Sequence, residues 1–215
     1  MCDMAPFRFP HRLYPIVDTL GDPQRTHIEL AEAMLAAGAR LLQLRMKESP
    51  TRVFVEAARA LQKRAAARGA KLIVNDRADI ARLVEAAGVH LGQDDLPAAD
   101  ARRLLGPDAI IGVSTHTPEQ AQAAAREGVA NYLGFGPIYA TSTKADPDPV
   151  QGVAGLQRAR AVVTLPIVAI GGITLATMTP VLAAGADAVA VIRDIVAAPD
   201  VRARVAEFLS RTGSR

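Results

Sequence analysis

Two cations and an amide alternate along one short stretch of the sequence, Gln43-Leu44-Arg45-Met46-Lys47. In an extended chain every second side chain points to the same face, so Gln43, Arg45 and Lys47 are placed to converge on one ligand. Two cations and an amide suit phosphate oxygens. Most Lys and Arg side chains only cover a protein surface, so this interpretation depends on where the stretch lies in the fold.

Carboxylates end two further apolar runs. Asn75-Asp76-Arg77 follows one run, and the residues HLGQDD at 90–95 end the next. Carboxylates at the tips of neighbouring strands can share one hard cation, and oxygen ligands with no nearby cysteine favour Mg²⁺ over zinc. An Asp before a helix is often only its N-cap, and this alternative applies to each carboxylate taken alone.

A hydroxyl-rich stretch, Ser114-Thr115-His116-Thr117, follows another apolar run. Ser114 can donate a hydrogen bond to a phosphate, whereas Thr117 is suited to cap a helix that begins at Pro118. His116 is open to two interpretations, an acid or base in catalysis and an imidazole with a structural role.

Two stretches near the end of the chain are suited to a simple phosphate. Gly171-Gly172 ends one apolar run, and Ile192-Arg193-Asp194 ends the next. Glycine lets an anion approach backbone N–H groups closely, which suits a phosphate monoester.

The elements that must position these residues repeat one unit, an aliphatic run followed by a polar turn and an amphipathic helical stretch. The runs are residues 13–17, 40–44, 71–74, 88–91, 109–113, 131–135, 166–170 and 188–192. Eight such units predict a parallel α/β fold, a (β/α)8 TIM barrel with its chemistry at the C-terminal ends of the strands. An open doubly wound sheet is the alternative, although the first turn, DTLGDPQRTH, lacks a GxGxxG fingerprint.

Composition limits the function further. We expect one domain over residues 1–215, with residues 1–11 as a frayed N-terminal tail. The net charge of +3 and the scattered Lys and Arg residues argue against nucleic-acid binding, and Cys2 alone makes neither an internal disulfide nor a CxxC site.

The uncharged stretch 161–186 is broken by Pro166, Gly171-Gly172 and Pro180, which argues against a membrane span. A cytoplasmic protein is the default expectation.

Six motifs together resemble one family. QLRMK, LIVNDR, GVHLGQDDLP, GVSTHT, GPIYATSTK and VAIGGIT occur in the order and spacing of thiamine phosphate synthase, from about Leu13 to the end of the last helix. The resemblance implies a cytoplasmic, often homodimeric (β/α)8 barrel. It also implies an alkyl transferase that joins hydroxymethylpyrimidine pyrophosphate to thiazole phosphate, forms thiamine phosphate and releases pyrophosphate, with Mg²⁺ as cofactor.

The resemblance also assigns residues to the two substrates and the metal. The residues implied for the pyrimidine pyrophosphate are Gln43, Arg45, Lys47, Asn75, Ser114 and Lys144. Asp76 and Asp95 are implied for Mg²⁺. The residues implied for the thiazole phosphate are Thr141, Thr143, Gly172, Ile192 and Arg193. Among these, the candidates for catalysis are Arg45, Lys47, Ser114 and Lys144.

The implied chemistry needs no protein nucleophile. The pyrimidine methylene carbon ionises away from pyrophosphate before the thiazole nitrogen attacks, so the leaving group needs stabilisation by Mg²⁺ and cations.

Two positions depart from the family pattern. Arg193 stands where many relatives have serine, and it either contacts the phosphate or turns outward. Met46 replaces a frequent acidic residue, and strand alternation predicts that it points away from the ligand.

The stretch GPIYATSTKADPDPVQG at 136–152 is expected to be the loop that leaves the sixth strand. Thr141 and Thr143 alternate, so an extended backbone would turn both toward one phosphate while Lys144 reaches the pyrophosphate. The Pro- and Asp-rich second half is long enough to act as a lid.

Two alternative functions stay open at the level of sequence. A thiazole tautomerase of the same barrel family would use a histidine near the end of the fifth strand, where His116 lies, but it has no need for the pyrophosphate residues. A non-catalytic regulatory paralogue is possible because a fold does not fix a function.

Overall fold

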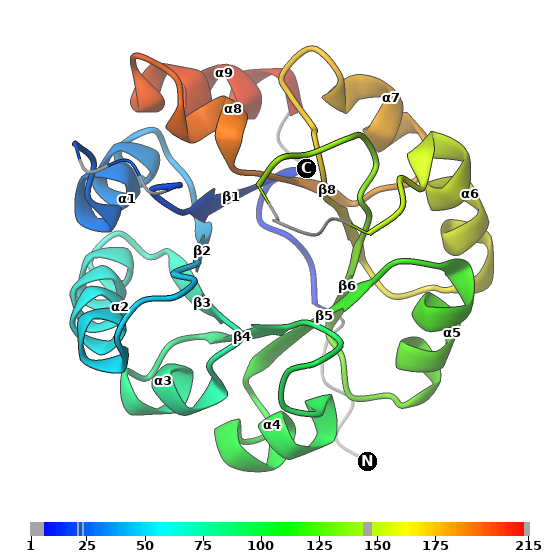
Figure 1. Ribbon diagram of the computed structural model, residues 1–215, viewed down its shortest axis with the longest axis horizontal. Helices are drawn as coiled ribbons and strands as arrows, with labels where there is room; N and C mark the ends of the chain where they lie inside the picture. The colour runs from blue at the N-terminus through cyan, green and yellow to red at the C-terminus, as the bar shows by residue number, and fades with distance from the viewer. Residues whose placement is uncertain (1–6, 21, 23, 144–147, 213–215) are drawn as a thin grey trace.

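The computed structural model describes residues 7–20, 22, 24–143 and 148–212. Over these residues the chain alternates strands and helices, and the helices form a ring around a central barrel (Figure 1). The strands are β1 (Leu13–Val17), β2 (Leu41–Leu44), β3 (Lys71–Asn75), β4 (Gly88–Leu91), β5 (Ile110–Thr115), β6 (Tyr132–Phe135), β7 (Ile167–Ala169) and β8 (Ala188–Val191). The helices are α1 (His27–Ala36), α2 (Thr51–Ala66), α3 (Ala78–Leu83), α4 (Ala98–Leu105), α5 (Pro118–Arg126), α6 (Gly152–Val162), α7 (Met178–Ala183), α8 (Arg193–Val196) and α9 (Val201–Thr212).

Each strand pairs in parallel with the next one in sequence, and β8 pairs with β1 to close the barrel. Leu13 of β1 lies opposite Val189 of β8 at the closing pair. The predicted (β/α)8 barrel is therefore confirmed, and the sheet is not open. All strands run in one direction, so their C-terminal ends form one mouth.

Local sequence signals set where the helices begin. Thr26 caps α1 in a reciprocal capping box with Glu29, and the Thr117 side chain accepts from the Gln120 N–H at the start of α5. The prediction that Thr117 caps a helix beginning at Pro118 is confirmed.

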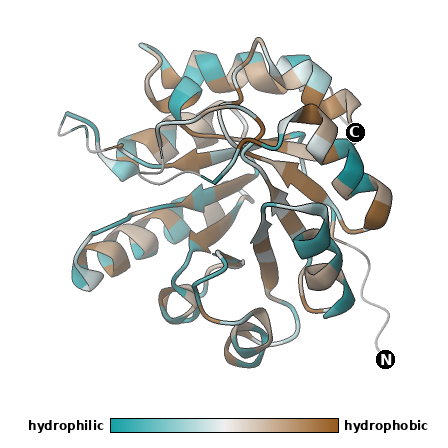
Figure 2. Cartoon of the chain, turned by 45° about the vertical axis from the view of Figure 1, so that its right-hand side comes forward, coloured by the Kyte–Doolittle hydropathy of each residue, from teal (hydrophilic) through white to brown (hydrophobic). Residues whose placement is uncertain are grey.

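The strands bury apolar side chains on both faces. Leu42 and Leu44 of β2 belong to the core between the strands and the helices, whereas Ile16, Leu41 and Ile73 belong to a second cluster inside the barrel. Figure 2 shows hydrophobic strands at the centre and hydrophilic residues on the outer surfaces of the helices. Two-sided burial explains why the strands read as continuous aliphatic runs.

The segment before β1 packs into the N-terminal end of the barrel. Phe9 is only 3% exposed, and its ring lies 5.8 Å from the Tyr14 ring and 5.1 Å from the Tyr132 ring, measured between centroids. Phe7 lies 5.5 Å from the Tyr132 ring. The expected frayed tail over residues 1–11 therefore differs from the structure at Phe7 and Phe9, because aromatic burial holds this segment in place.

None of the helices in the described part of the chain has the length and apolar character that a membrane span requires.

Candidate active site at the barrel mouth

Polar side chains replace apolar ones inside the barrel toward its C-terminal mouth. Gln43 is the register partner of Ile16 and Ile73, which point into the barrel interior, so Gln43 shares that direction. Asn75 and His90 are register partners on β3 and β4. Gln43, Asn75 and His90 are each less than 10% exposed.

Arg45 is held by a carboxylate from the neighbouring strand. It follows β2 and donates a charge-assisted hydrogen bond to Asp18, which follows β1. The side chains of both residues are mostly buried, at 18% and 10% exposure, so solvent screens this ion pair little. Asp18 also accepts a hydrogen bond of 2.7 Å from the Leu20 N–H. The guanidinium of Arg45 is therefore fixed at the mouth.

Lys47, Asp76 and Asp95 form a charged cluster at the same edge. Lys47 makes an ion pair with Asp76, which follows β3. Burial raises the pKa of Asp95, and contact with the Asp76 carboxylate raises it further, against the lowering effects of the Gly92 N–H and the Lys47 charge. Asp76 adopts a backbone φ of 65°, a conformation that costs energy for a residue with a side chain. Two carboxylates and one ammonium group thus lie close together at this edge of the mouth.

Neither carboxylate of this pair serves as a helix N-cap. Arg77 precedes α3 and Pro97 precedes α4, and neither makes a side-chain cap. Asp95 instead accepts a hydrogen bond of 2.6 Å from the Gly92 N–H within its own loop. The simple capping interpretation of Asp76 and Asp95 therefore does not hold.

The paired carboxylates fit a hard divalent cation. Burial raises the pKa of Asp95, the neighbouring Asp76 carboxylate raises it further, and a bound cation would remove this electrostatic cost. Within the described ranges no group of three or more His, Cys, Asp or Glu side chains is placed to hold a metal ion. Two carboxylates are nevertheless a donor set that suits Mg²⁺, which is usually held by one or two carboxylates, water and phosphate oxygens of the substrate.

Asn75 and Ser114 complete this side of the mouth. Asn75 is 8% exposed, and its side-chain amide makes no hydrogen bond with the part of the chain that the structure describes. Ser114, near the end of β5, lies with Oγ 2.9 Å from His90 Nε2. Its backbone carbonyl accepts a hydrogen bond from the Gln93 side chain.

The glycine turn after β7 lies against the loop after β6. The Ile138 N–H donates to the Ile170 carbonyl at 2.8 Å, and the Tyr139 N–H donates to the Gly171 carbonyl at 3.0 Å. Gly172 has a φ of +61°, and a Cβ added there would lie 2.4 Å from the Ala140 carbonyl oxygen. Only glycine meets both requirements, so this pair of loops is closely fitted.

The loop after β6 departs from the expected extended form. Its backbone bends at Ser142 and Thr143, and the Thr141 hydroxyl accepts a hydrogen bond of 3.3 Å from the Thr143 N–H. Hydroxyl side chains often bond to the backbone two residues later in this way, which competes with an extended segment. Lys144 lies outside the described residues.

The turn after β8 leads directly into α8. Ile192 precedes this helix, and Arg193 begins it with an exposed side chain that makes no hydrogen bond or ion pair with described residues. Asp194 accepts a hydrogen bond of 3.0 Å from the Leu175 N–H, which ties this turn to the loop after β7. Met46 packs against the core between strands and helices, which is the outward direction that strand alternation predicted.

His116 is engaged by the loop after β6. Its Nδ1 lies 2.8 Å from the Gly136 carbonyl oxygen, and its Nε2 lies 3.5 Å from an Asp148 carboxylate oxygen. Its backbone N–H donates to the Gln120 side chain at 2.7 Å. These contacts favour the structural interpretation of this histidine over a role as acid or base.

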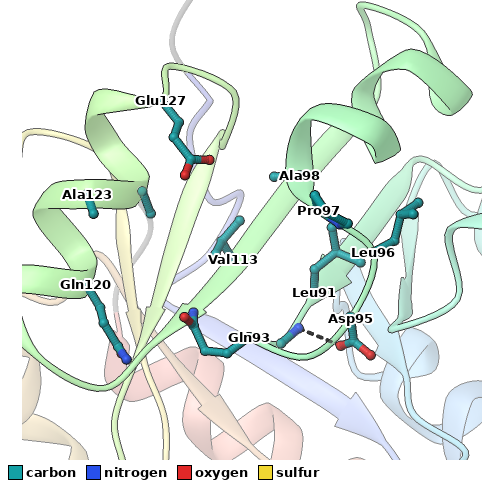
Figure 3. A pocket seen from close by; sticks show the side chains of 12 residues that line it. Leu91, Gln93, Asp95, Leu96, Pro97, Ala98, Val113, Gln120, Ala123 and Glu127 are labelled. Carbon is teal, nitrogen blue, oxygen red and sulfur yellow. Dashed lines mark hydrogen bonds between the residues drawn. The ribbon is translucent and has the colours of Figure 1, made fainter.

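A groove opens beside the mouth between α4 and α5. Figure 3 shows Gln93 and Asp95 at one end, with Gln120 and Glu127 on the α5 side. The dashed line in Figure 3 is the hydrogen bond from Gly92 to Asp95. Asp95 therefore lines this groove and also interacts with Asp76 and Lys47.

The sequence and structure of the chain are similar to those of known proteins. A family model described as thiamine monophosphate synthase matches residues 13–195. The chain belongs to the thiamine monophosphate synthase family. The resemblance found from the six sequence motifs is confirmed, and with it the class of activity, a transferase of thiamine biosynthesis.

Individual members of the thiamine monophosphate synthase family match most of the chain. A thiamine-phosphate synthase of Shouchella clausii is 48% identical and covers 90% of this chain and 92% of its own. One of Moorella thermoacetica is 47% identical and covers 93% and 96%. A solved structure of thiamine phosphate pyrophosphorylase from Pyrococcus furiosus is 35% identical, with a TM-score of 0.84, and covers 95% of this chain and 98% of its own.

Sequence reasoning missed Asp18 at the mouth and three further residues inside the barrel. Asp18 directly follows the first aliphatic run, so the same strand-end rule that selected Asp76 would have found it. Tyr14, Tyr132 and His90 lie within strands. The contacts of Tyr14 with Gln43, of Tyr14 with Tyr132 and of His90 with Ser114 depend on the closed barrel. No local sequence signal marks those three contacts.

Proposed function

We propose that this chain joins hydroxymethylpyrimidine pyrophosphate to thiazole phosphate at the barrel mouth, forming thiamine phosphate and releasing pyrophosphate. Membership of the synthase family supports the reaction. The observation that carries the assignment of the site is the cluster of Lys47, Asp76 and Asp95 beside the fixed Arg45. This cluster has the charges that a metal-bound pyrophosphate needs.

In the proposed reaction the bond between the pyrimidine methylene carbon and the pyrophosphate oxygen breaks, and its electron pair leaves with the pyrophosphate. The thiazole nitrogen then supplies the electron pair of the new C–N bond. Arg45, Lys47 and Lys144 stabilise the charge on the leaving group. Ser114, Gln43 and Asn75 orient the pyrimidine pyrophosphate, and the closed site excludes water that would capture the cation.

Asp76 and Asp95 would hold the Mg²⁺ ion. The bound metal would supply positive charge next to the pyrophosphate oxygens, which stabilises the leaving group. Lys47 makes an ion pair with Asp76. With Asp76 and Asp95 holding the metal, Lys47 would have the pyrophosphate as its anionic partner.

The thiazole phosphate would bind on the opposite side of the mouth. Thr141 and Thr143, Gly172 and the Ile192-Arg193 turn are proposed for this phosphate. The support is the close fit between the loop after β6 and the glycine turn, and the bond that ties the turns after β7 and β8 together. The exposed Arg193 side chain leaves the backbone of this turn as the first candidate for binding.

We further propose that the enzyme works in the cytoplasm and forms homodimers. Its partners would be the two small-molecule substrates alone, with no nucleic acid and no membrane. The scattered charges described in the sequence and the family resemblance support this proposal.

Incubation of the protein with both substrates and Mg²⁺ tests the reaction directly. Thiamine phosphate and pyrophosphate in equal amounts are the expected products. Isomerisation of the thiazole phosphate without coupling would instead indicate a tautomerase. The absence of any conversion, with a relative such as the Moorella thermoacetica protein active in the same assay, would indicate a non-catalytic protein.

Lys144→Ala tests the proposed stabilisation of the leaving group. The variant is expected to keep its fold and to lose at least about a hundredfold in single-turnover rate, because one cation next to the developing charge is missing. Lys71→Ala is the matched control, since Lys71 is exposed at the N-terminal end of β3. Equal rates for Lys144→Ala and Lys71→Ala would contradict the role of Lys144.

A further inference from the structure

A chain of hydrogen bonds crosses the barrel interior and joins two of the proposed substrate residues. Gln43 Nε2 lies 3.2 Å from Tyr14 Oη, and Tyr14 Oη lies 3.1 Å from Tyr132 Oη. Tyr132 Oη lies 3.0 Å from His90 Nδ1, and His90 Nε2 lies 2.9 Å from Ser114 Oγ. The side chains come from β1, β2, β4, β5 and β6, so the chain spans most of the barrel.

The middle of this chain is sealed from solvent and closely fitted. Tyr14 and Tyr132 are 1% and 0% exposed. A Cβ added at Gly112 would lie 2.2 Å from Tyr132 Cζ and 2.5 Å from His90 Nδ1, and one added at Gly134 would lie 3.0 Å from His90 Cε1. The two inward-facing glycines therefore leave the space in which His90 and Tyr132 meet.

The donors and acceptors along the chain can all be satisfied in one direction. The structure directs the Gln43 amide nitrogen, a donor, at Tyr14 Oη. Tyr14 then donates to Tyr132, and Tyr132 donates to His90 Nδ1. A neutral imidazole that accepts at Nδ1 carries its hydrogen on Nε2, which donates to Ser114 Oγ. The hydroxyls of Tyr14 and Tyr132 then each accept one hydrogen bond and donate one.

The ends of the chain then have opposite hydrogen-bonding character. Among the described residues, the Gln43 carbonyl oxygen is left as an acceptor and the Ser114 hydroxyl hydrogen as a donor. We propose that Tyr14, Tyr132 and His90 are positioning residues that fix this polarity, so that Gln43 offers an acceptor to the aminopyrimidine and Ser114 a donor to the pyrophosphate. The substrate part of this inference rests on the proposed function, whereas the polarity does not.

The ionisation states of the chain agree with this direction. Burial disfavours a charged imidazole at His90, and both of its ring nitrogens have hydrogen-bond partners. Burial also raises the pKa of Tyr14 and of Tyr132, so both remain phenols that can donate. A neutral chain of this kind keeps its hydrogen bonds in one order because reversal requires every member to turn together.

Nitrogen NMR of histidine-labelled protein tests the polarity without any substrate. His90 is expected to show an unprotonated Nδ1 and a protonated Nε2 in the wild-type protein. Tyr132→Phe removes the donor to Nδ1, so the two tautomers should mix or exchange. Tyr14→Phe is the matched control, because it removes a hydroxyl of equal size but leaves the Tyr132 bond to His90. A wild-type His90 protonated at Nδ1 would overturn the proposal, whatever reaction the enzyme performs.

Steady-state kinetics test whether the chain orients the substrate. Tyr132→Phe and Tyr14→Phe should each lower kcat/KM for the pyrimidine pyrophosphate by about tenfold, the effect of one lost buried hydrogen bond. The KM for the thiazole phosphate should stay unchanged. If both substrates were affected alike, or neither were, the tyrosines would only fill the barrel and the positioning role would be rejected.

Discussion

Arg45 and Lys47 each have a carboxylate partner in the free protein, but the two ion pairs differ in character. The Arg45 pair with Asp18 is mostly buried, whereas the Lys47 side chain is 53% exposed. An exposed ion pair contributes little stability and is exchanged easily. Arg45 is therefore held in place, whereas Lys47 is the cation that we propose changes partners when pyrophosphate binds.

His90 should make the folding stability depend on pH. Its pKa in the folded protein is about 4 and its ordinary value is 6.5, so the unfolded chain binds a proton that the folded protein does not. Stability is therefore lost as pH falls below the unfolded value. Between about pH 7 and about pH 4.5, this single group accounts for roughly 2 kcal/mol.

Urea unfolding of the wild-type protein and of His90→Gln across this pH range measures that contribution. The variant is expected to lose less stability on acidification than the wild type, whatever its stability at neutral pH. If the free energies of unfolding of the two proteins changed with pH by the same amount, folding would not lower the pKa of His90.

At the scale of elements, the loops that leave the strands carry the site, and the glycine turn after β7 is the most tightly fitted of those described above. Gly172 and Gly69 have nearly the same φ, +61° and +63°, but a Cβ at Gly69 meets nothing within 4 Å. Gly172→Ala and Gly69→Ala therefore share the conformational penalty. Only the first adds a clash with the loop after β6.

Gly172→Ala is expected to lower the free energy of unfolding by about 2 kcal/mol more than Gly69→Ala does. Urea unfolding measures the difference. The same variant should raise the KM for thiazole phosphate, because the two loops can no longer meet. Equal destabilisation by the two substitutions would mean that the loop after β6 moves aside at little cost in free energy.

Most of the strands and their inward-facing positions could be predicted from the sequence. The alternation of aliphatic runs and amphipathic stretches predicted the barrel. Because the C-terminal ends of its parallel strands meet at one mouth, the barrel in turn predicted correctly that Asp76 and Asp95 lie together. The contact between Tyr14 and Tyr132 was not predictable, because it joins residues 118 apart on strands that are not neighbours. The bend at Thr143 was also missed, since a local hydroxyl bond outweighs simple alternation there.

At the scale of the whole molecule, the barrel is closed at one end by aromatic rings and open to ligands at the other. The Phe9 ring packs against Tyr14 and Tyr132, which form the middle of the hydrogen-bond chain. All three side chains are almost completely buried. The N-terminal segment therefore belongs to the core, although its sequence has no helical or strand periodicity.

Phe9→Ala is expected to lower the free energy of unfolding by about 3 kcal/mol, because it empties a buried aromatic site. Phe7→Ala should cost less, since Phe7 is only partly buried. Thermal or urea unfolding of both variants measures this order. A Phe9→Ala protein as stable as the wild type would show that the segment does not contribute to the core.

We propose that Asp76 and Asp95 at the mouth bind pyrophosphate through Mg²⁺. Calorimetric titration with pyrophosphate, with and without Mg²⁺, measures this directly. We predict that Mg²⁺ strengthens binding by at least about tenfold in the wild type and has no such effect in Asp95→Asn. Equal pyrophosphate affinity with and without Mg²⁺, or an undiminished Mg²⁺ effect in Asp95→Asn, would contradict this account.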